Sequence, residues 1–208
     1  MTGNEEESST KGLHVCPAKH AGWLTISLRK AINNPTRILR GLAKTGYTVV
    51  DLGCGPGYFS LPLAEMVGGT GQVIAVDLQA EMLERLRVRA EAAGLASRIR
   101  LHQCAADSLG LEASADLALA FWMLHEVPDK ERFLKEVYAI LNDDGRFLLV
   151  EPWGHVSAVE YRRSVAKATA AGLKPLKRVR VGFSRATLFE RGDVMMAEVP
   201  EHGGGGLQ

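Results

Sequence analysis

Short apolar runs alternate with segments of helical periodicity along most of this chain. Five runs of six or seven residues are rich in Val, Ile, Leu and Ala, which favours buried strands. They cover Tyr47–Leu52, Gln72–Asp77, Arg98–Gln103, Ala115–Phe121 and Gly145–Glu151. Strands of this length that alternate with helices favour a parallel sheet covered on both faces.

The helical segments are recognised by apolar residues that recur at three- and four-residue spacing, in Glu81–Ala93, Asp129–Leu141 and Ser157–Ala171. After the fifth strand the pattern changes to two shorter strand-like runs, Lys174–Val181 and Ala186–Glu190, which predict an antiparallel hairpin at the sheet edge. The predicted fold is therefore a doubly wound α/β domain with seven strands, mostly parallel, and helices on both faces.

Composition agrees with one ordinary globular domain, because the 208 residues are 46% hydrophobic and 24% charged. The longest apolar stretch, Ala115–Leu124, is interrupted by Asp116 and is too short for the ~20 residues of a membrane span. Three cysteines without regular spacing fit a reducing compartment, and the acidic Glu5–Glu7 near the N-terminus does not resemble a signal peptide. We expect a cytoplasmic protein.

Polarity and glycine content divide the chain further. We predict a disordered tail at 1–11, an N-terminal helical lid segment at 12–45, the main domain at 46–192 and a flexible tail at 193–208. The net charge of +1 conceals a local excess, since residues 160–191 hold nine basic and two acidic residues, a net +7. This basic stretch is either a solvated strand face or a surface that attracts an anionic substrate or nucleic acid.

The segment Asp51–Gly57 places three glycines at alternate positions directly after the first strand. Such a loop is either a tight strand-to-helix turn or a ligand cradle at the carboxyl end of the sheet. Its spacing differs from that of dinucleotide-binding loops. The carboxylate of Asp51 would repel a pyrophosphate and attract a cation. Asp77 ends the second strand, where an acidic residue commonly accepts ribose hydroxyls. Together these features describe a nucleoside with a cationic tail.

Five segments in this order resemble the motifs of the class I S-adenosylmethionine-dependent methyltransferases, in particular the branch that includes the ubiquinone and menaquinone methyltransferases. They are 49–58, 73–77, 104–108, 118–129 and 141–151. The resemblance implies a Rossmann-like sheet, S-adenosylmethionine as the cofactor with S-adenosylhomocysteine as its product, and methyl transfer by in-line displacement.

Residue by residue, the resemblance also implies a cofactor site. The amino-acid end of the cofactor would lie at the glycine loop, the ribose at the end of the second strand, the adenine at 107–108 and the methionine portion at the end of the fourth strand. The residues expected to bind it are Asp51, Gly53, Cys54, Gly55, Gly57, Asp77, Leu78, Met82, Asp107, Ser108 and Phe121.

Candidate catalytic residues follow the fourth strand. His125, with Glu126 beside it, is a candidate base for an acceptor that must lose a proton, because histidine titrates near neutral pH. Alternatively, His125 caps local backbone or lines the pocket without proton transfer. Glu151 and His155, after the fifth strand, form a second candidate pair on the substrate side.

Aromatic and sulfur-containing residues give weaker hypotheses. Trp122 and Trp23, together with Trp153, form either an aromatic wall around the substrate or ordinary packing. Cys16 is expected within the lid over the substrate pocket; with its neighbouring histidines it falls short of a metal site, and no metal is predicted. Cys16 and Cys104 resemble metalloid-binding thiols of the arsenite methyltransferases, but the cysteine-bearing extension of those enzymes is missing.

The leading interpretation is a methyltransferase (EC 2.1.1.-) that modifies a small molecule. Three alternatives stay open: a cofactor-binding module without turnover, a metalloid or thiol methyltransferase, and a nicotinamide-dependent oxidoreductase. The fourth strand lacks the Asn/Asp-Pro-Pro-aromatic motif of DNA amine methyltransferases, so a nucleic-acid partner is not expected. No membrane span is expected either, because the apolar stretches are too short. A monomer and a homodimer are equally compatible with the sequence.

Overall fold

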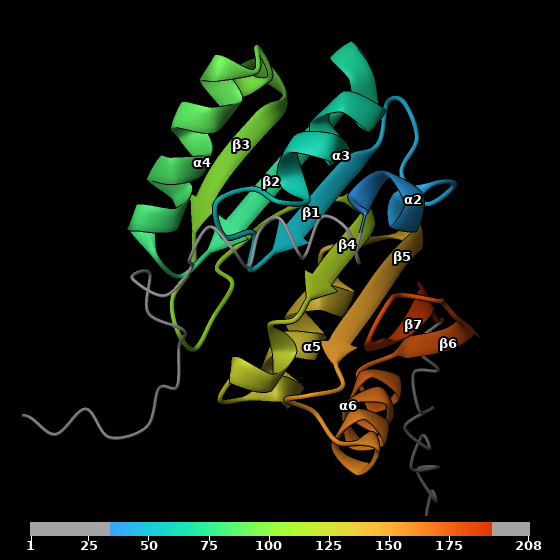
Figure 1. Ribbon diagram of the computed structural model, residues 1–208. Coiled ribbons are helices and arrows are strands. Elements are labelled where there is room, and N and C mark those ends of the chain that lie inside the picture. Colours follow the sequence, from blue (N-terminus) through green and yellow to red (C-terminus); the bar gives the residue numbers. More distant parts are fainter. Residues whose placement is uncertain (1–33, 193–208) are drawn as a thin grey trace, which may run out of the picture.

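A computed structural model describes residues 34–192 and contains one seven-stranded sheet in the order β3-β2-β1-β4-β5-β7-β6 (Figure 1). The strands are β1 (Thr48–Leu52), β2 (Gln72–Asp77), β3 (Ile99–Gln103), β4 (Ala115–Phe121), β5 (Leu141–Pro152), β6 (Leu173–Arg178) and β7 (Ser184–Arg191). Strands β1 to β5 are mutually parallel, whereas β7 runs antiparallel to both β5 and β6. The predicted sheet and its edge hairpin are confirmed.

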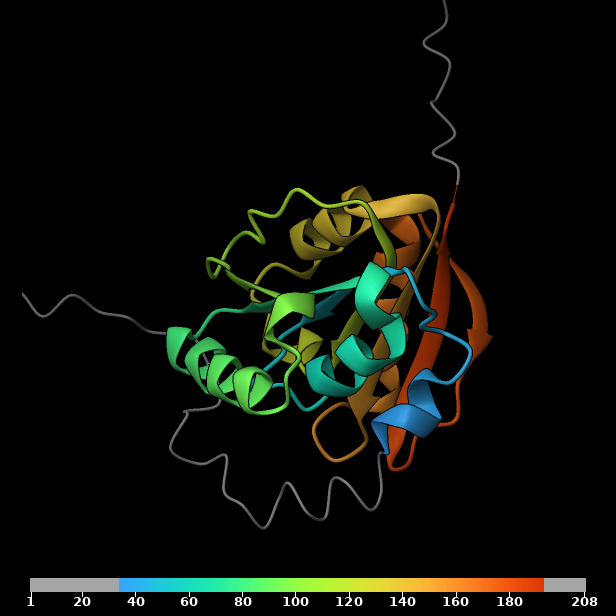
Figure 2. The same cartoon turned by 90° about the horizontal axis from the view of Figure 1, so that it is seen from above.

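Helices cover both faces of the sheet, as the view from above shows (Figure 2). The helices are α2 (Pro35–Leu39), α3 (Ser60–Val67), α4 (Ala80–Ala92), α5 (Lys130–Ala139) and α6 (Ala158–Ala170), with short 3-10 turns η2 (Gly68–Thr70), η3 (Ala96–Arg98) and η4 (Leu124–Glu126). Alternate residues of each strand serve the two faces. Val49 of β1 belongs to the core cluster that includes residues of α2 and α3, whereas Val50 belongs to the cluster that includes residues of α5 and α6.

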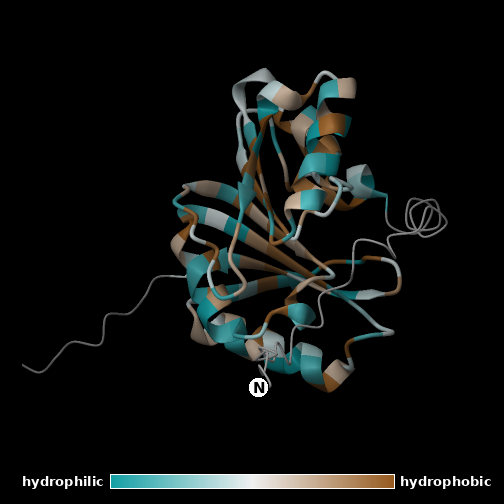
Figure 3. Cartoon of the chain, turned by 90° about the vertical axis from the view of Figure 1, so that its left-hand side faces the viewer, coloured by the Kyte–Doolittle hydropathy of each residue, from teal (hydrophilic) through white to brown (hydrophobic). Residues whose placement is uncertain are grey.

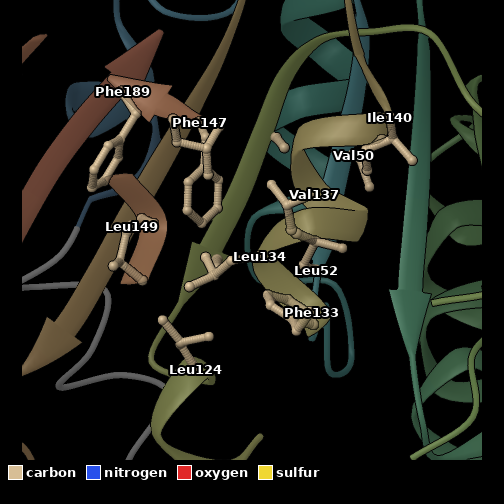
Figure 4. Packing of buried hydrophobic residues seen from close by; sticks show 14 of the residues in the cluster. Val50, Leu52, Leu124, Phe133, Leu134, Val137, Ile140, Phe147, Leu149 and Phe189 are labelled. Atoms are coloured by element: carbon tan, nitrogen blue, oxygen red, sulfur yellow. The ribbon is translucent and has the colours of Figure 1, made fainter. Parts of the chain in front are cut away.

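The larger core lies between the sheet and helices α5 and α6. Phe133, Leu134 and Val137 of α5 point toward the strands (Figure 4), and the rings of Phe147 and Phe189 stack at 5.8 Å between centroids. Hydrophobic residues concentrate in the strands, whereas the helices alternate hydrophobic and hydrophilic residues (Figure 3). Burial of this kind is the main source of stability, at roughly 1.5–3 kcal/mol for each large apolar side chain.

Local capping explains where two of the predicted helices begin. The carboxylate of Asp129 accepts hydrogen bonds from the backbone N–H groups of Glu131 and Arg132, at 3.1 and 3.0 Å. Ser157 and Glu160 form a reciprocal capping box at the start of α6. Each cap satisfies backbone donors that the first helical turn leaves unpaired. Asp129 and Ser157, predicted as the first helical residues, are therefore the N-caps, and the helices begin one residue later.

One helix and several strand ends differ from the pattern-based prediction; β6, for example, ends at Arg178 rather than Val181, and β7 begins at Ser184 rather than Ala186. Helix α3 was not predicted, because it is short and contains Pro62; this proline is tolerated because it lies in the first turn, where N–H groups have no helical acceptor. Strand β5 begins at Leu141 rather than Gly145, because Leu141 pairs with Ala115 before the register shifts.

Some expectations concern residues outside the described range. Cys16 and Trp23, and most of the predicted lid at 12–45, lie before residue 34. Within residues 34–192, no helix is long and apolar enough to cross a membrane.

Candidate cofactor and acceptor site

The carboxyl ends of the parallel strands gather the chemically active residues at one edge of the sheet. The chain order reverses between β1 and β4, which are neighbours in space although two strands separate them in sequence. Loops diverge at such a switch point and leave room for a ligand. The glycine loop follows β1, Asp77 ends β2, and the segment with His125 follows β4.

Asp51 is a buried carboxylate near the end of β1, with 2% of its surface exposed. Its Oδ2 accepts a hydrogen bond of 2.6 Å from Ser60 Oγ at the start of α3. Burial raises the pKa of Asp51 to about 7; the Ser60 hydroxyl opposes this shift, and the nearby Asp77 charge adds to it. The ionised carboxylate is therefore under-stabilised in the protein alone, and a cation brought beside it would favour ionisation.

Asp77 is held by backbone donors from both sides. Its Oδ2 accepts from Gly55 N–H at 2.8 Å, and its Oδ1 accepts from Gln79 N–H at 2.9 Å. Burial raises the pKa of Asp77, and these N–H donors act in the opposite direction. Each carboxylate oxygen can accept a further hydrogen bond. The side chain is thus fixed in position and retains acceptor capacity for a pair of hydroxyls.

The three glycines of the loop have different physical reasons for being glycine. All three have positive φ angles, 68° at Gly53, 52° at Gly55 and 85° at Gly57. A Cβ on Gly57 would lie 2.2 Å from a methyl carbon of Leu86 in α4, and one on Gly53 would lie 2.9 Å from Met123. A Cβ on Gly55 would meet no atom within 4 Å. Gly57 and Gly53 therefore allow close packing, whereas Gly55 borders open space that a ligand can enter.

The loop after β3 is pinned to helix α5. Glu136 accepts hydrogen bonds from the Ser108 hydroxyl, at 3.3 Å, and from the Leu109 N–H. Asp107 is 77% exposed and lies 3.6 Å from the Arg132 guanidinium. The two residues expected at the adenine are therefore placed by contacts with α5.

The remaining residues expected at the cofactor line the same region with different burial. Leu78 is half-buried after β2, whereas Met82 in the first turn of α4 is buried. The half-buried ring of Phe121 at the end of β4 lies 4.3 Å from the Phe59 ring, between centroids. Cys54 is buried, and its thiol donates to Gly55 O at 3.5 Å, which fits a structural role in the loop.

His125 and Glu151 meet, although they belong to different candidate pairs in the sequence. Glu151 is 1% exposed; its Oε2 lies 2.6 Å from His125 Nδ1, and its Oε1 accepts the His125 N–H at 3.2 Å. The contact arises because β4 and β5 are adjacent and parallel, so their carboxyl ends coincide. Since an ionised carboxylate only accepts hydrogen bonds, the proton of a neutral imidazole resides on Nδ1. Nε2 is then free of a proton and can act as a base.

The electrostatics of this dyad favour the charged imidazole. The hydrogen bond that His125 donates to Glu151 raises the pKa of His125, and partial burial opposes that shift. Glu126 adds a weaker contribution of the same sign, with its carboxylate 3.9 Å from Nε2. The imidazole rings of His125 and His155 contact each other edge to face, with their centroids 5.8 Å apart. The structure thus brings all four sequence candidates together.

The three tryptophan candidates behave differently. Trp122 adopts a positive φ of 60° and donates from Nε1 to Ser184 Oγ at 2.9 Å. Trp153 is 55% exposed and contacts the ring of Phe183. Trp23 lies outside the described residues. Two of the three tryptophans therefore lie directly after β4 and β5, at the same edge of the sheet as His125 and Glu151.

Metal and thiolate chemistry finds no support in the part of the chain that the structure describes. Over residues 34–192, no group of three His, Cys, Asp or Glu side chains is arranged to hold a metal ion. Cys54 and Cys104 are both unbridged, and burial raises the pKa of each thiol, which disfavours the thiolate. The basic run along β6 is exposed, as a solvated strand face would be.

Several supporting residues escape sequence reasoning. Ser60 holds Asp51, Glu136 holds the loop after β3, and Arg89 of α4 donates to the carbonyl of Pro56 in the glycine loop. Glu136 and Arg89 are distant in sequence from the groups they position, and Ser60 belongs to a helix that was not predicted, so neither spacing nor periodicity reveals these contacts. Helical periodicity marks Arg89 and Glu136 only as residues off the apolar face.

The family comparison agrees with this geometry. Residues 43–182 match a family model described as a methyltransferase domain, which covers well over half of the chain. The chain belongs to this family. It is a class I S-adenosylmethionine-dependent methyltransferase domain, as the five sequence motifs and the sheet order predict.

Curated relatives of this methyltransferase domain are distant. A demethylmenaquinone methyltransferase of Lactobacillus johnsonii is 34% identical over 111 residues, covering 52% of this chain and 45% of the relative. A ubiquinone/menaquinone biosynthesis C-methyltransferase of Haemophilus ducreyi is 34% identical over 109 residues, with 52% and 42% covered. The matched segment thus spans less than half the length of either relative.

A solved structure of a SAM-dependent methyltransferase from Aquifex aeolicus aligns with 81% of this chain and 97% of its own, at 21% identity and a TM-score of 0.72. This likeness concerns the fold. The residues of the methyltransferase domain also fit the cofactor chemically. Asp51 can balance an ammonium group, Asp77 can accept two hydroxyls, and Gly55 leaves its side-chain position open.

Proposed function

We propose that this methyltransferase domain transfers a methyl group to a small-molecule acceptor with an ionisable hydroxyl, and that His125 is the general base. The observation that supports the base is the 2.6 Å contact between His125 Nδ1 and the buried Glu151. An acceptor whose attacking atom already has a free lone pair needs no base. A base oriented by a carboxylate is useful for an acceptor, such as a hydroxyl, that must lose a proton.

The acceptor atom is either the hydroxyl oxygen or, on a phenol, the ring carbon beside it. Deprotonation of a phenol raises electron density at both positions, so one base can start both reactions. After attack by carbon, the ring C–H proton must also leave and the oxygen regains a proton, whereas attack by oxygen requires only loss of the hydroxyl proton. The relatives from Haemophilus ducreyi and Lactobacillus johnsonii are named as a C-methyltransferase of quinone biosynthesis and a demethylmenaquinone methyltransferase. The dyad fits this chemistry as well as it fits oxygen methylation.

Each residue of the site then has a defined task. Bound S-adenosylmethionine supplies an electrophilic methyl group on a sulfonium. Asp51 and Asp77 would hold its ammonium and ribose ends, so that the methyl donor and the acceptor are brought together. Glu151 orients the His125 ring and keeps its proton on Nδ1, so that Nε2 takes the acceptor proton. Glu126 then lies 3.9 Å from the imidazolium that forms and stabilises its charge.

Calorimetric titration with S-adenosylmethionine, S-adenosylhomocysteine and NAD tests the cofactor assignment. We expect the first two to bind and NAD not to bind. Binding of NAD without S-adenosylmethionine would contradict the proposal in favour of an oxidoreductase. Asp77→Ala, which removes the ribose acceptor, should abolish binding of both adenosyl compounds.

Turnover tests the base. S-adenosylhomocysteine formation would be followed with a panel of phenols and aliphatic alcohols for the wild type and His125→Ala. We expect His125→Ala to lower kcat by roughly 10²–10⁴-fold, the range of general-base contributions, with unchanged affinity for S-adenosylhomocysteine. Equal kcat at every pH would refute the base. Absence of turnover with any acceptor, together with tight cofactor binding, would favour the alternative of a cofactor-binding module.

A further inference from the structure

Two exposed aromatic side chains stand at the edge of the acceptor side without a role in the cofactor site. Trp153 follows β5 and is 55% exposed, and Phe183 precedes β7 and is 65% exposed. Their rings meet nearly perpendicular at 6.1 Å between centroids. Large exposed aromatic residues that already contact each other are more typical of a binding surface than of scattered surface residues.

The backbone of this region is strained and tied together. Among residues 34–192, Trp122 and Phe183 are the non-glycine residues with positive φ, at 60° and 49°. Ser184 links them, since its hydroxyl accepts from Trp122 Nε1 at 2.9 Å and donates to Gly182 O at 3.1 Å. Trp153 N–H donates to Phe183 O at 3.0 Å. Backbone strain that the surroundings maintain is concentrated at functional sites.

A cation accompanies the aromatic pair. The guanidinium of Arg185 lies 6.0 Å from the centroid of the Trp153 ring, and its Nη1 donates to Val156 O at 2.9 Å. Among the described residues Arg185 takes part in no ion pair within 4 Å, and its remaining N–H donors are available. Arg180, in the turn between β6 and β7, is exposed and adds positive charge.

The strand register connects this cation with the catalytic dyad. Glu151 of β5 is the direct partner of Arg185 of β7, so the two side chains project from the same face of the antiparallel pair. Glu151 in turn holds His125. The base and the cation therefore stand on one face at the carboxyl end of β5, with Trp153 two residues beyond Glu151.

We propose that Trp153, Phe183 and Arg185 form the recognition surface for the acceptor, and that they select a planar ring that carries an anionic substituent. This proposal rests on the proposed function, because it takes the hydroxyl of the same ring to reach His125. The ring packs against the aromatic pair, and the carboxylate or similar anion pairs with the guanidinium of Arg185. The end of β5, the β6–β7 turn and the start of β7 thereby set acceptor specificity together.

The test compares three probes on protein saturated with S-adenosylhomocysteine: 4-hydroxybenzoate, its neutral amide 4-hydroxybenzamide, and the non-planar trans-4-hydroxycyclohexanecarboxylate. Affinities would be measured by calorimetry or by ligand-observed NMR. We expect the wild type to bind 4-hydroxybenzoate at least tenfold more tightly than either of the other two. No measurable affinity for 4-hydroxybenzoate at 10 mM, or equal affinity for all three, would overturn the proposal.

Variants assign the preference to individual residues. Arg185→Gln should abolish the preference of carboxylate over amide, whereas Lys177→Gln, which removes an exposed cation of β6, should preserve it. Phe183→Gly should weaken both aromatic probes without loss of stability, because glycine adopts positive φ freely and the lost side chain is exposed. If Arg185→Gln and Lys177→Gln change the preference of carboxylate over amide equally, the preference arises from general surface charge, and the assignment to Arg185 is refuted.

The same samples separate this proposal from the proposed function. Failure of S-adenosylhomocysteine to bind the wild type would refute both. Binding of S-adenosylhomocysteine and loss of turnover in His125→Ala, combined with an unchanged probe preference in Arg185→Gln, would refute only the recognition surface.

Discussion

Two buried carboxylates at the carboxyl edge of the sheet, Asp51 and Glu151, differ in what their neighbours provide. Asp51 faces a neutral hydroxyl donor on Ser60, so burial dominates and raises the pKa of Asp51 to about 7. Glu151 faces the imidazole and the backbone N–H of His125, and the hydrogen bond raises the pKa of His125 instead. Within residues 34–192 Asp51 thus has no cationic partner, whereas Glu151 already has one in the protonated form of His125.

The Glu151–His125 contact makes a prediction about the pH dependence of catalysis. A base must be neutral to accept a proton, so kcat should rise with pH through the raised pKa of His125. Glu151→Gln removes the negative charge, so the midpoint should move to lower pH. The maximal rate should also fall, because the amide can donate to Nδ1 and place the proton on Nε2. The pH profile of kcat measures both effects.

Glu126→Gln is the matched control for this prediction. Its carboxylate is farther from the imidazole, at 3.9 Å from Nε2, and its influence on the pKa of His125 is weaker than that of Glu151. We expect a smaller downward shift of the midpoint. A profile for Glu151→Gln that coincides with that of the wild type would show that His125 does not control the rate.

The arrangement of strands explains why the sequence predicts some parts of the site and not others. The glycine loop and Asp77 are local motifs at strand ends, so residue types and spacing are enough to propose them. The dyad is different. Glu151 and His125 are 26 residues apart, and only the adjacency of β4 and β5 joins them. Pattern alone left Glu151 paired with His155, its neighbour in sequence.

Contacts between elements also limit what the glycine pattern can show. The sequence treats the glycines of the loop alike, whereas the packing of α4 gives Gly57 a different role from Gly55. Helix α3 was missed for a related reason, because a short segment with a proline has little periodicity of its own. Its position is determined by burial of Leu63 and Val67 against the sheet.

The glycine loop provides a prediction at the scale of elements. Gly57→Ala forces a Cβ toward Leu86 at a φ of 85°, so it should destabilise the fold by more than the ~1–2 kcal/mol of left-handed strain alone. In Gly55→Ala the new Cβ meets open space at a φ of 52°, so the free energy of unfolding should decrease only by that strain energy. Binding of S-adenosylhomocysteine should nevertheless weaken strongly, because the methyl group occupies the space for the ligand. Urea unfolding and calorimetry measure the two effects.

The double variant Gly57→Ala with Leu86→Ala separates packing from strain. If the contact with Leu86 causes the extra loss, the effects of the two substitutions on the free energy of unfolding should be less than additive. Equal losses of stability and of cofactor affinity in Gly55→Ala and Gly57→Ala would contradict the division of roles between the two glycines.

The molecule as a whole concentrates its charge unevenly, although the net charge is +1. Exposed basic residues lie along β6 at one edge of the sheet. The lysines and Pro175 of this strand also discourage pairing with another strand. Buried acidic residues lie at the carboxyl edge, at Asp51, Asp77 and Glu151. Sequence statistics reveal the basic excess but not the burial of these carboxylates, which depends on how the sheet and helices enclose them.

Burial of Asp51 makes global stability depend on pH in a direction opposite to that of a salt-bridged carboxylate. The pKa is about 7 in the folded protein and about 3.9 in an unfolded chain, so between these values the native state holds a proton that the unfolded state has released. The free energy of unfolding should therefore decrease as pH rises from about 4 to 7, by at most about 4 kcal/mol. Asp51→Asn should flatten this decrease, as urea unfolding at several pH values would measure.

Binding reverses this dependence, which gives the prediction an independent readout. The cationic end of the cofactor favours the ionised carboxylate, so binding at low pH must first release the proton of Asp51. The dissociation constant of S-adenosylhomocysteine should fall by up to tenfold per pH unit between about pH 5.5 and 7 and then level off. Asp51→Asn should bind weakly, with little dependence on pH across this range. A wild-type affinity that is constant from pH 5.5 to 7 would show that the proton on Asp51 does not control cofactor binding.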